Sequence, residues 1–134
     1  MQIQVPPAVD QRAKVYDCKT CEVPLALERS RIARHNKYQG RDGPAFLFKE
    51  TSNIQASPPF EMEMTTGRHT VRNISCAKCD ALVGWMYVNA PRASEQYKVG
   101  NYMLEKELLC EGIEGQHEAV RPYKGKEKQF SCNF

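Results

Sequence analysis

The sequence predicts a small, mainly β protein that is stabilised by a bound metal. Two Cys-x-x-Cys pairs stand far apart, one near the start of the chain and one past its middle. Around them, short apolar runs alternate with glycine, proline and other turn residues, a pattern typical of strands. A chain of 134 residues forms one domain with a modest core. A metal that joins distant segments would therefore add needed stability.

Each cysteine pair has the spacing of a metal-binding turn. A gap of two residues lets both thiolates of a pair approach one ion, and two pairs supply four ligands in a tetrahedron. Zinc suits four thiolates best, so we expect one Zn²⁺ bound by Cys18, Cys21, Cys76 and Cys79. Four sulfurs leave no open position, which indicates a structural site. The alternative is two disulfides in a secreted protein, but no signal peptide follows Met1.

The other elements follow from the hydrophobic pattern. Residues 1–12 contain two prolines and few large apolar groups, so we expect a loose arm. Residues 60–65 alternate between apolar and polar, which predicts a strand with its three apolar side chains on one face. Residues 81–88 are too continuously apolar for an exposed hairpin and predict a central strand. The remaining expected elements are a strand at 45–48, an extended segment at 69–74, a helical turn at 91–97 and a last strand beginning at 102–104.

The charge of the chain argues against nucleic acid as its partner. The formal net charge is +3, and four thiolates with one Zn²⁺ would lower it to about +1. One local cluster is basic, and no acidic residue interrupts it. It is either a solvated loop or a docking surface for an acidic partner. Its members are Arg29, Arg31, Arg34, Lys37 and Arg41.

Longer motifs extend from Tyr16 to about Glu105. They are Tyr16-x-Cys18-x-x-Cys21, residues 24–27 and 39–48, Asn53, residues 67–71, Cys76-x-x-Cys79, and residues 84–87, 96–98 and 100–105. In this order and spacing they resemble the Yippee family of small zinc proteins. The chain departs from that family at Asn73, where an aspartate is usual, and at Asp80, where a glycine is common.

The resemblance implies a β-tent, in which two antiparallel sheets meet at an angle and zinc joins their hairpins. It divides the chain into the arm of residues 1–12, a zinc-binding domain of residues 13–109 and an extension of residues 110–134, which we expect to be flexible. It also implies an adaptor or regulatory subunit in cell growth or division, in the nucleus and cytoplasm. Some members associate with ubiquitin ligases of the GID type. Related Mis18 domains imply a centromere scaffold as an alternative.

A second implication concerns a pocket. Trp85 and Tyr87 should share one strand face. In the related ligand domain of cereblon, the matching positions are aromatic walls of a cage for a cyclic imide, and His69 stands near a further wall. A small-ligand pocket lined by His69, Trp85 and Tyr87 is therefore one interpretation. The other is that the two aromatic residues belong to the core and that His69 is a hydrogen-bonded histidine at its edge.

An enzymatic function is the remaining alternative. Methionine-sulfoxide reductases of the B type also carry two Cys-x-x-Cys zinc pairs, and Cys132 would then supply the nucleophile. Cys132 stands in a polar tail with no obvious base, so we expect no catalytic residue. Cys110 and Cys132 are instead expected to be free thiols.

Overall fold

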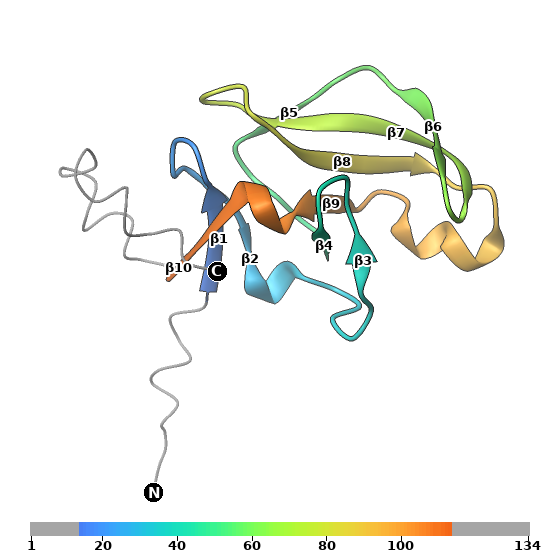
Figure 1. Ribbon diagram of the computed structural model, residues 1–134, viewed down its shortest axis with the longest axis horizontal. Coiled ribbons are helices and arrows are strands. Elements are labelled where there is room, and N and C mark those ends of the chain that lie inside the picture. The colour runs from blue at the N-terminus through green and yellow to red at the C-terminus, as the bar shows by residue number, and fades with distance from the viewer. Residues whose placement is uncertain (1–13, 114–134) are drawn as a thin grey trace, which may run out of the picture.

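Ten strands and three short 3₁₀ helices form residues 14–113, the part of the chain that the computed structural model describes (Figure 1). The elements are β1 (Lys14–Cys18), β2 (Pro24–Leu27), η2 (Glu28–Ser30), β3 (Tyr38–Gln39), β4 (Pro44–Phe48), β5 (Ile54–Ala56), β6 (Phe60–Met64), β7 (Gly67–Cys76), β8 (Leu82–Asn89), η3 (Ala93–Lys98), β9 (Tyr102–Glu105), η4 (Lys106–Leu108) and β10 (Leu109–Ile113). None of these helices has the length and apolar character needed to span a membrane.

The strands form two antiparallel sheets, which confirms the predicted fold class. The smaller sheet has the order β10-β1-β2, and the larger has the order β3-β4-β9-β8-β7-β5, with β6 also paired to β7. Strand β7 is ten residues long. Its first half pairs with β6 and its second half with β5, so one long strand supports two short ones. In Figure 1 the smaller sheet lies at one end of the molecule and β6 at the other.

Most of the predicted elements are present, and the largest differences lie near the ends. The strand at 60–65 is β6, and the strand at 81–88 is β8, which lies between β7 and β9 as expected for a central strand. The helical turn at 91–97 is the 3₁₀ helix η3. The strand beginning at Tyr102 is β9, but it is not the last, because β10 follows and pairs with β1. Strand β10 thus continues past the domain end predicted at residue 109. Residues 1–12 lie outside the described part of the chain, as do residues 114–134 of the predicted extension.

Two apolar cores lie on opposite faces of the larger sheet. Successive residues of a strand point to opposite faces, so Phe46 and Phe48 of β4 belong to the core beneath the smaller sheet, while Ala45 and Leu47 belong to the other. The first core holds Tyr16, whose ring centroid is 5.5 Å from that of Phe48. Burying each large side chain contributes about 1.5–3 kcal/mol. The first core therefore holds the two sheets together. The second core forms the floor of a cleft that is described below.

Candidate metal centre and cleft

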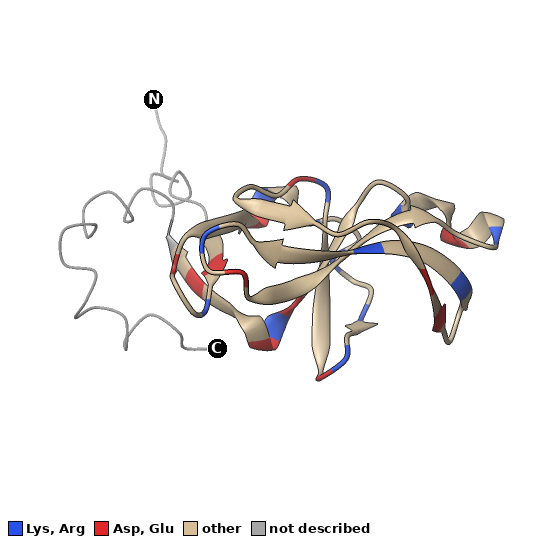
Figure 2. Cartoon of the chain, turned by 90° about the horizontal axis from the view of Figure 1, so that it is seen from above, with Lys and Arg blue, Asp and Glu red and all other residues tan. Residues whose placement is uncertain are grey.

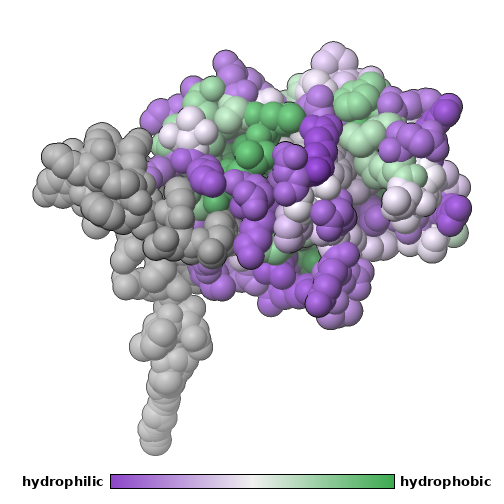
Figure 3. Space-filling view, viewed as in Figure 1, coloured by the Kyte–Doolittle hydropathy of each residue, from purple (hydrophilic) through white to green (hydrophobic). Residues whose placement is uncertain are grey.

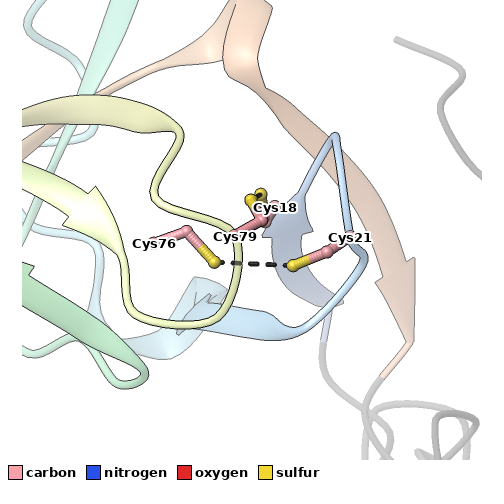
Figure 4. Close-up of side chains that lie close together, drawn as sticks. All are labelled: Cys18, Cys21, Cys76 and Cys79. Carbon is pink, nitrogen blue, oxygen red and sulfur yellow. Dashed lines mark hydrogen bonds between the residues drawn. The ribbon is translucent and has the colours of Figure 1, made fainter.

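The four cysteines of the two Cys-x-x-Cys pairs converge on one point between the sheets. Their sulfur atoms all lie within 4.8 Å of one another (Figure 4). The Sγ atoms of Cys18 and Cys79 are 3.6 Å apart, and those of Cys21 and Cys76 are 3.4 Å apart. Four sulfurs at about 2.3 Å from a tetrahedral zinc would be separated by about 3.8 Å. The donor set and its spacing therefore fit zinc.

The same turn presents each pair of sulfurs. After β1, the amide of Cys18 donates to the Val23 carbonyl (2.9 Å), and the amide of Glu22 donates to the Cys18 carbonyl (2.7 Å). After β7, Cys76 and Asp80 repeat both bonds, each at 2.8 Å. Glu22 and Asp80, each directly after the second cysteine, have φ of 65° and 66°. Glycine adopts this left-handed conformation at little cost, whereas the two residues here adopt it with a side chain.

The thiols of this cluster hold their protons with different strengths. Burial raises the pKa of Cys18, and it raises that of Cys21 to about 12. Burial also acts on Cys76, but hydrogen bonds from the amides of Cys79 and Lys78 and from neighbouring thiols outweigh it, so that the pKa of Cys76 is lowered. A divalent cation would have to displace the protons of Cys18 and Cys21, and in doing so it would neutralise the buried negative charge.

The expectation of a free thiol at Cys110 is wrong. Cys110 is fully buried in β10, where it stands opposite Asp17 of β1, and its sulfur is disulfide-bonded. It takes no part in the four-sulfur cluster. The other predicted free thiol, Cys132, lies outside the described residues.

A cleft of about 1030 Å³ opens over the second core. Trp85 and Tyr87 of β8 line it, as the pocket interpretation predicted, and their ring centroids are 6.3 Å apart. Both side chains also belong to the core, at 4% and 2% exposure, so the two interpretations are compatible. Apolar side chains reach the surface over β6, which borders the cleft (Figure 3). Binding of a ligand in this cleft stays a prediction.

His69 lies behind the cleft rather than in its wall. It is fully buried, and its ring centroid is 5.5 Å from that of Tyr87. Its Nδ1 is 3.0 Å from the Gly67 carbonyl oxygen, so Nδ1 carries the proton and donates. The other ring nitrogen is 3.5 Å from the Thr66 hydroxyl. This is the hydrogen-bonded histidine of the alternative interpretation, and its ring packs edge-on against Tyr87.

Sequence reasoning missed a buried lysine at the cleft. Lys98, at the end of η3, is only 7% exposed, and its Nζ lies 2.5 Å from Oε1 of Glu95. Nζ is also 5.5 Å from the ring centroids of Tyr38 and Tyr87 and 6.0 Å from that of Tyr97. The hydroxyls of Tyr38 and Tyr97 are 2.6 Å apart. A buried ammonium is stable only with such partners. The available signal was the Gln-Tyr-Lys motif at 96–98, in which Lys98 stands three residues after Glu95.

Two members of the predicted basic cluster are paired with an acidic residue, and the docking surface itself stays a prediction. Glu28, directly before the basic stretch, lies 3.4 Å from Arg31 and 3.6 Å from Arg34. Arg31 also stacks over the Phe46 ring at 4.2 Å. Arg29 makes interactions of its own. Only Lys37 and Arg41 of the set line the cleft. Figure 2 shows basic and acidic residues interspersed along the described chain.

Comparison with known proteins agrees with this geometry. The family model described as "Yippee zinc-binding/DNA-binding /Mis18, centromere assembly" matches residues 14–123. Protein yippee of Drosophila melanogaster is 39% identical over 98 residues, covering 73% of this chain and 79% of that protein. A yippee-like protein of Schizosaccharomyces pombe is 37% identical over 97 residues, covering 72% of each. The crystal structure of a Mis18 "Yippee-like" domain shares the fold, with a TM-score of 0.61 and 16% identity, over 75% of this chain and 95% of that one.

Proposed function

Since the chain belongs to the Yippee-Mis18 family, we propose that it is a zinc-stabilised protein-interaction module without chemistry of its own. The observation that carries this proposal is the four-sulfur cluster, whose members come from both sheets. A four-thiolate zinc is coordinatively closed and serves to hold structure. The remaining functional feature of the described residues is a cleft, which suits binding rather than catalysis.

In this proposal a single zinc ion is bound by Cys18, Cys21, Cys76 and Cys79. One cysteine pair follows the first strand of the smaller sheet and the other follows β7 of the larger sheet. Zinc binding to comparable small sites contributes about 10 kcal/mol or more at neutral pH. That is similar to the entire stability of a small domain. The ion would thus fix the angle between the sheets and with it the shape of the cleft.

At the level of the cell, we propose an adaptor or regulatory subunit that works in the nucleus and cytoplasm, in association with a ubiquitin ligase of the GID type. The Yippee motifs from Tyr16 to Glu105 support this proposal. A Mis18-like centromere scaffold is the alternative within the family. The structural likeness to the Mis18 domain stands at 16% identity and speaks for the fold alone.

A small-ligand pocket is the second candidate function, and one observation favours it. The cleft of about 1030 Å³ is lined by two adjoining aromatic rings, those of Trp85 and Tyr87. A concave and partly aromatic cleft of this size is typical of sites for small ligands. Binding of DNA, which the family description mentions, finds little support in a net charge of +3 and a divided basic cluster.

Two measurements test the proposal. Elemental analysis of purified protein should give one zinc per chain, which Cys79→Ser should abolish and Ala77→Ser, an exposed change in the same turn, should preserve. Affinity purification of the tagged chain from cells, followed by mass spectrometry, should recover ubiquitin-ligase subunits with the parent and Ala77→Ser but not with Cys79→Ser. Zinc-free native protein would refute the structural part. Reproducible absence of ligase subunits would refute the adaptor part.

A further inference from the structure

We infer that the cleft beside Trp85 is the partner-binding site and that it takes a peptide segment carrying a large apolar side chain next to a carboxylate. This inference rests on the proposed function, since it names the chemistry of the partner. Two features of the cleft support it: an apolar floor and wall of suitable size, and two rim cations whose side chains form no ion pair among the described residues.

The floor and one wall of the cleft are apolar. Trp85, Tyr87 and Met103 form the floor, and Met62 and Met64 of β6 form part of the wall. Methionine side chains adapt to differently shaped apolar groups, which suits a recognition surface. The volume of about 1030 Å³ can admit a large side chain together with its neighbours along a peptide.

The charges at the cleft favour an acidic segment. Two carboxylates line the cleft, and both already have partners: Glu95 contacts Lys98 at 2.5 Å, and Glu63 contacts Arg68 at 3.1 Å. The side-chain cations of two rim residues, Lys37 and Arg41, form no ion pair within residues 14–113, although the backbone amide of Arg41 donates to the Glu105 carboxylate.

Arg41 is held close to the apolar floor. Its guanidinium lies 5.5 Å above the Trp85 ring and donates to the Asn73 side-chain oxygen at 3.3 Å. A carboxylate beside an anchor on Trp85 would meet Arg41 directly. The cleft therefore offers adjoining sites for an apolar group and a negative charge.

The test uses capped hexapeptides in three matched forms: a central leucine or phenylalanine flanked by aspartates, the same anchors flanked by lysines, and a central alanine flanked by aspartates. Trp85, the only tryptophan, reports binding by fluorescence, and calorimetry measures the affinity. We expect the aspartate-flanked apolar peptides to bind at least tenfold more tightly than either control set. The double variant Lys37→Gln/Arg41→Gln should lose about tenfold in affinity. The charge-matched Lys49→Gln/Arg92→Gln, exposed and outside the cleft, should lose nothing.

A second pair of variants tests the apolar wall. Met62→Glu puts a carboxylate in the wall and should abolish binding, whereas Phe60→Glu, on the same strand face but outside the cleft lining, should leave it unchanged. Equal affinity for aspartate- and lysine-flanked peptides would overturn the inference. So would an absence of peptide binding, a steeply salt-dependent affinity for single-stranded DNA in its place, or a dimer that Met62→Glu dissociates. Zinc content, measured on the same samples, separates these failures from failure of the proposed function.

Discussion

Oε1 of Glu105 accepts hydrogen bonds from the backbone amide of Arg41 at 2.8 Å and from that of Asp42 at 3.1 Å. Glu105 belongs to β9 and is only 2% exposed. Gly40 lies against the same carboxylate, because a Cβ at Gly40 would be 2.6 Å from Oε1. A buried side chain of the larger sheet thus fixes the loop that carries Arg41 to the cleft. This contact explains why residues 40–42 of the 39–48 motif are Gly-Arg-Asp: the glycine leaves room for the carboxylate, and the next two amides bind it.

We expect Glu105→Ala to destabilise the protein by about 2–3 kcal/mol, because two backbone amides would lose a buried, charged acceptor. Glu105→Gln keeps an oxygen at the same place and should cost less. Denaturant unfolding followed by far-UV circular dichroism measures both values. Trp85 fluorescence of the folded Glu105→Ala variant should also shift as the loop releases Arg41. Equal stability of the parent and the alanine variant would show that the loop at residues 40–42 does not depend on the Glu105 hydrogen bonds.

Metal removal should unfold the domain. Chelation would remove about 10 kcal/mol of binding free energy, and the described residues would then lose the closure between β1 and β7. Circular dichroism and Trp85 fluorescence during chelator titration, with zinc readdition as the control, report this change. A chelated protein that retains its strand signal and its unfolding midpoint would contradict a structural role for the ion.

Glu22→Gly should stabilise the folded protein by up to about 1 kcal/mol. Glu22 has a φ of 65°, a conformation that costs an ordinary residue free energy and a glycine almost none. Glu22→Ala is the matched control, because alanine removes the side chain but keeps the strain. Thermal unfolding of the zinc-loaded proteins should rank glycine above the other two. A glycine variant no more stable than the alanine variant would indicate that the greater entropy of the unfolded glycine chain cancels the relief of backbone strain.

The Glu95–Lys98 pair should behave as a coupled unit. Glu95→Gln would leave the buried Lys98 ammonium without its carboxylate and should cost about 3–5 kcal/mol. The double variant Glu95→Gln/Lys98→Met removes the charge as well and should recover much of that loss. A double-mutant cycle in denaturant measures the coupling. Additive effects of the two changes would mean that the tyrosine rings alone stabilise the ammonium.

The metal ligands and the central strands could be predicted from the sequence because local patterns specify them. Cysteine spacing marks the two turns, and the apolar run at 81–88 marks β8. The smaller sheet could not be predicted in the same way. Strands β10 and β1 pair although they lie at opposite ends of the described chain, as Lys14 and Ile113 show. A pairing between such distant segments leaves no local hydrophobic pattern in the sequence.

The cleft was predicted only in part for the same reason. Trp85 and Tyr87 are two residues apart on one strand, so their shared face follows from strand geometry. Lys98 of η3 lies over the Tyr87 ring, and Tyr38 of β3 packs against the same core, so both come from other segments of the chain. Likewise, the neutralisation of Arg31 and Arg34 depends on Glu28 just outside the stretch that looked purely basic.

The pairing of Lys14 with Ile113 also bears on how the protein can be handled. It brings the first and last described residues to the same corner of the molecule, while β6 and η3 lie at the far end in Figure 1. A reporter or purification handle joined beside either residue would start from that corner, well away from the groove in which a partner is sought.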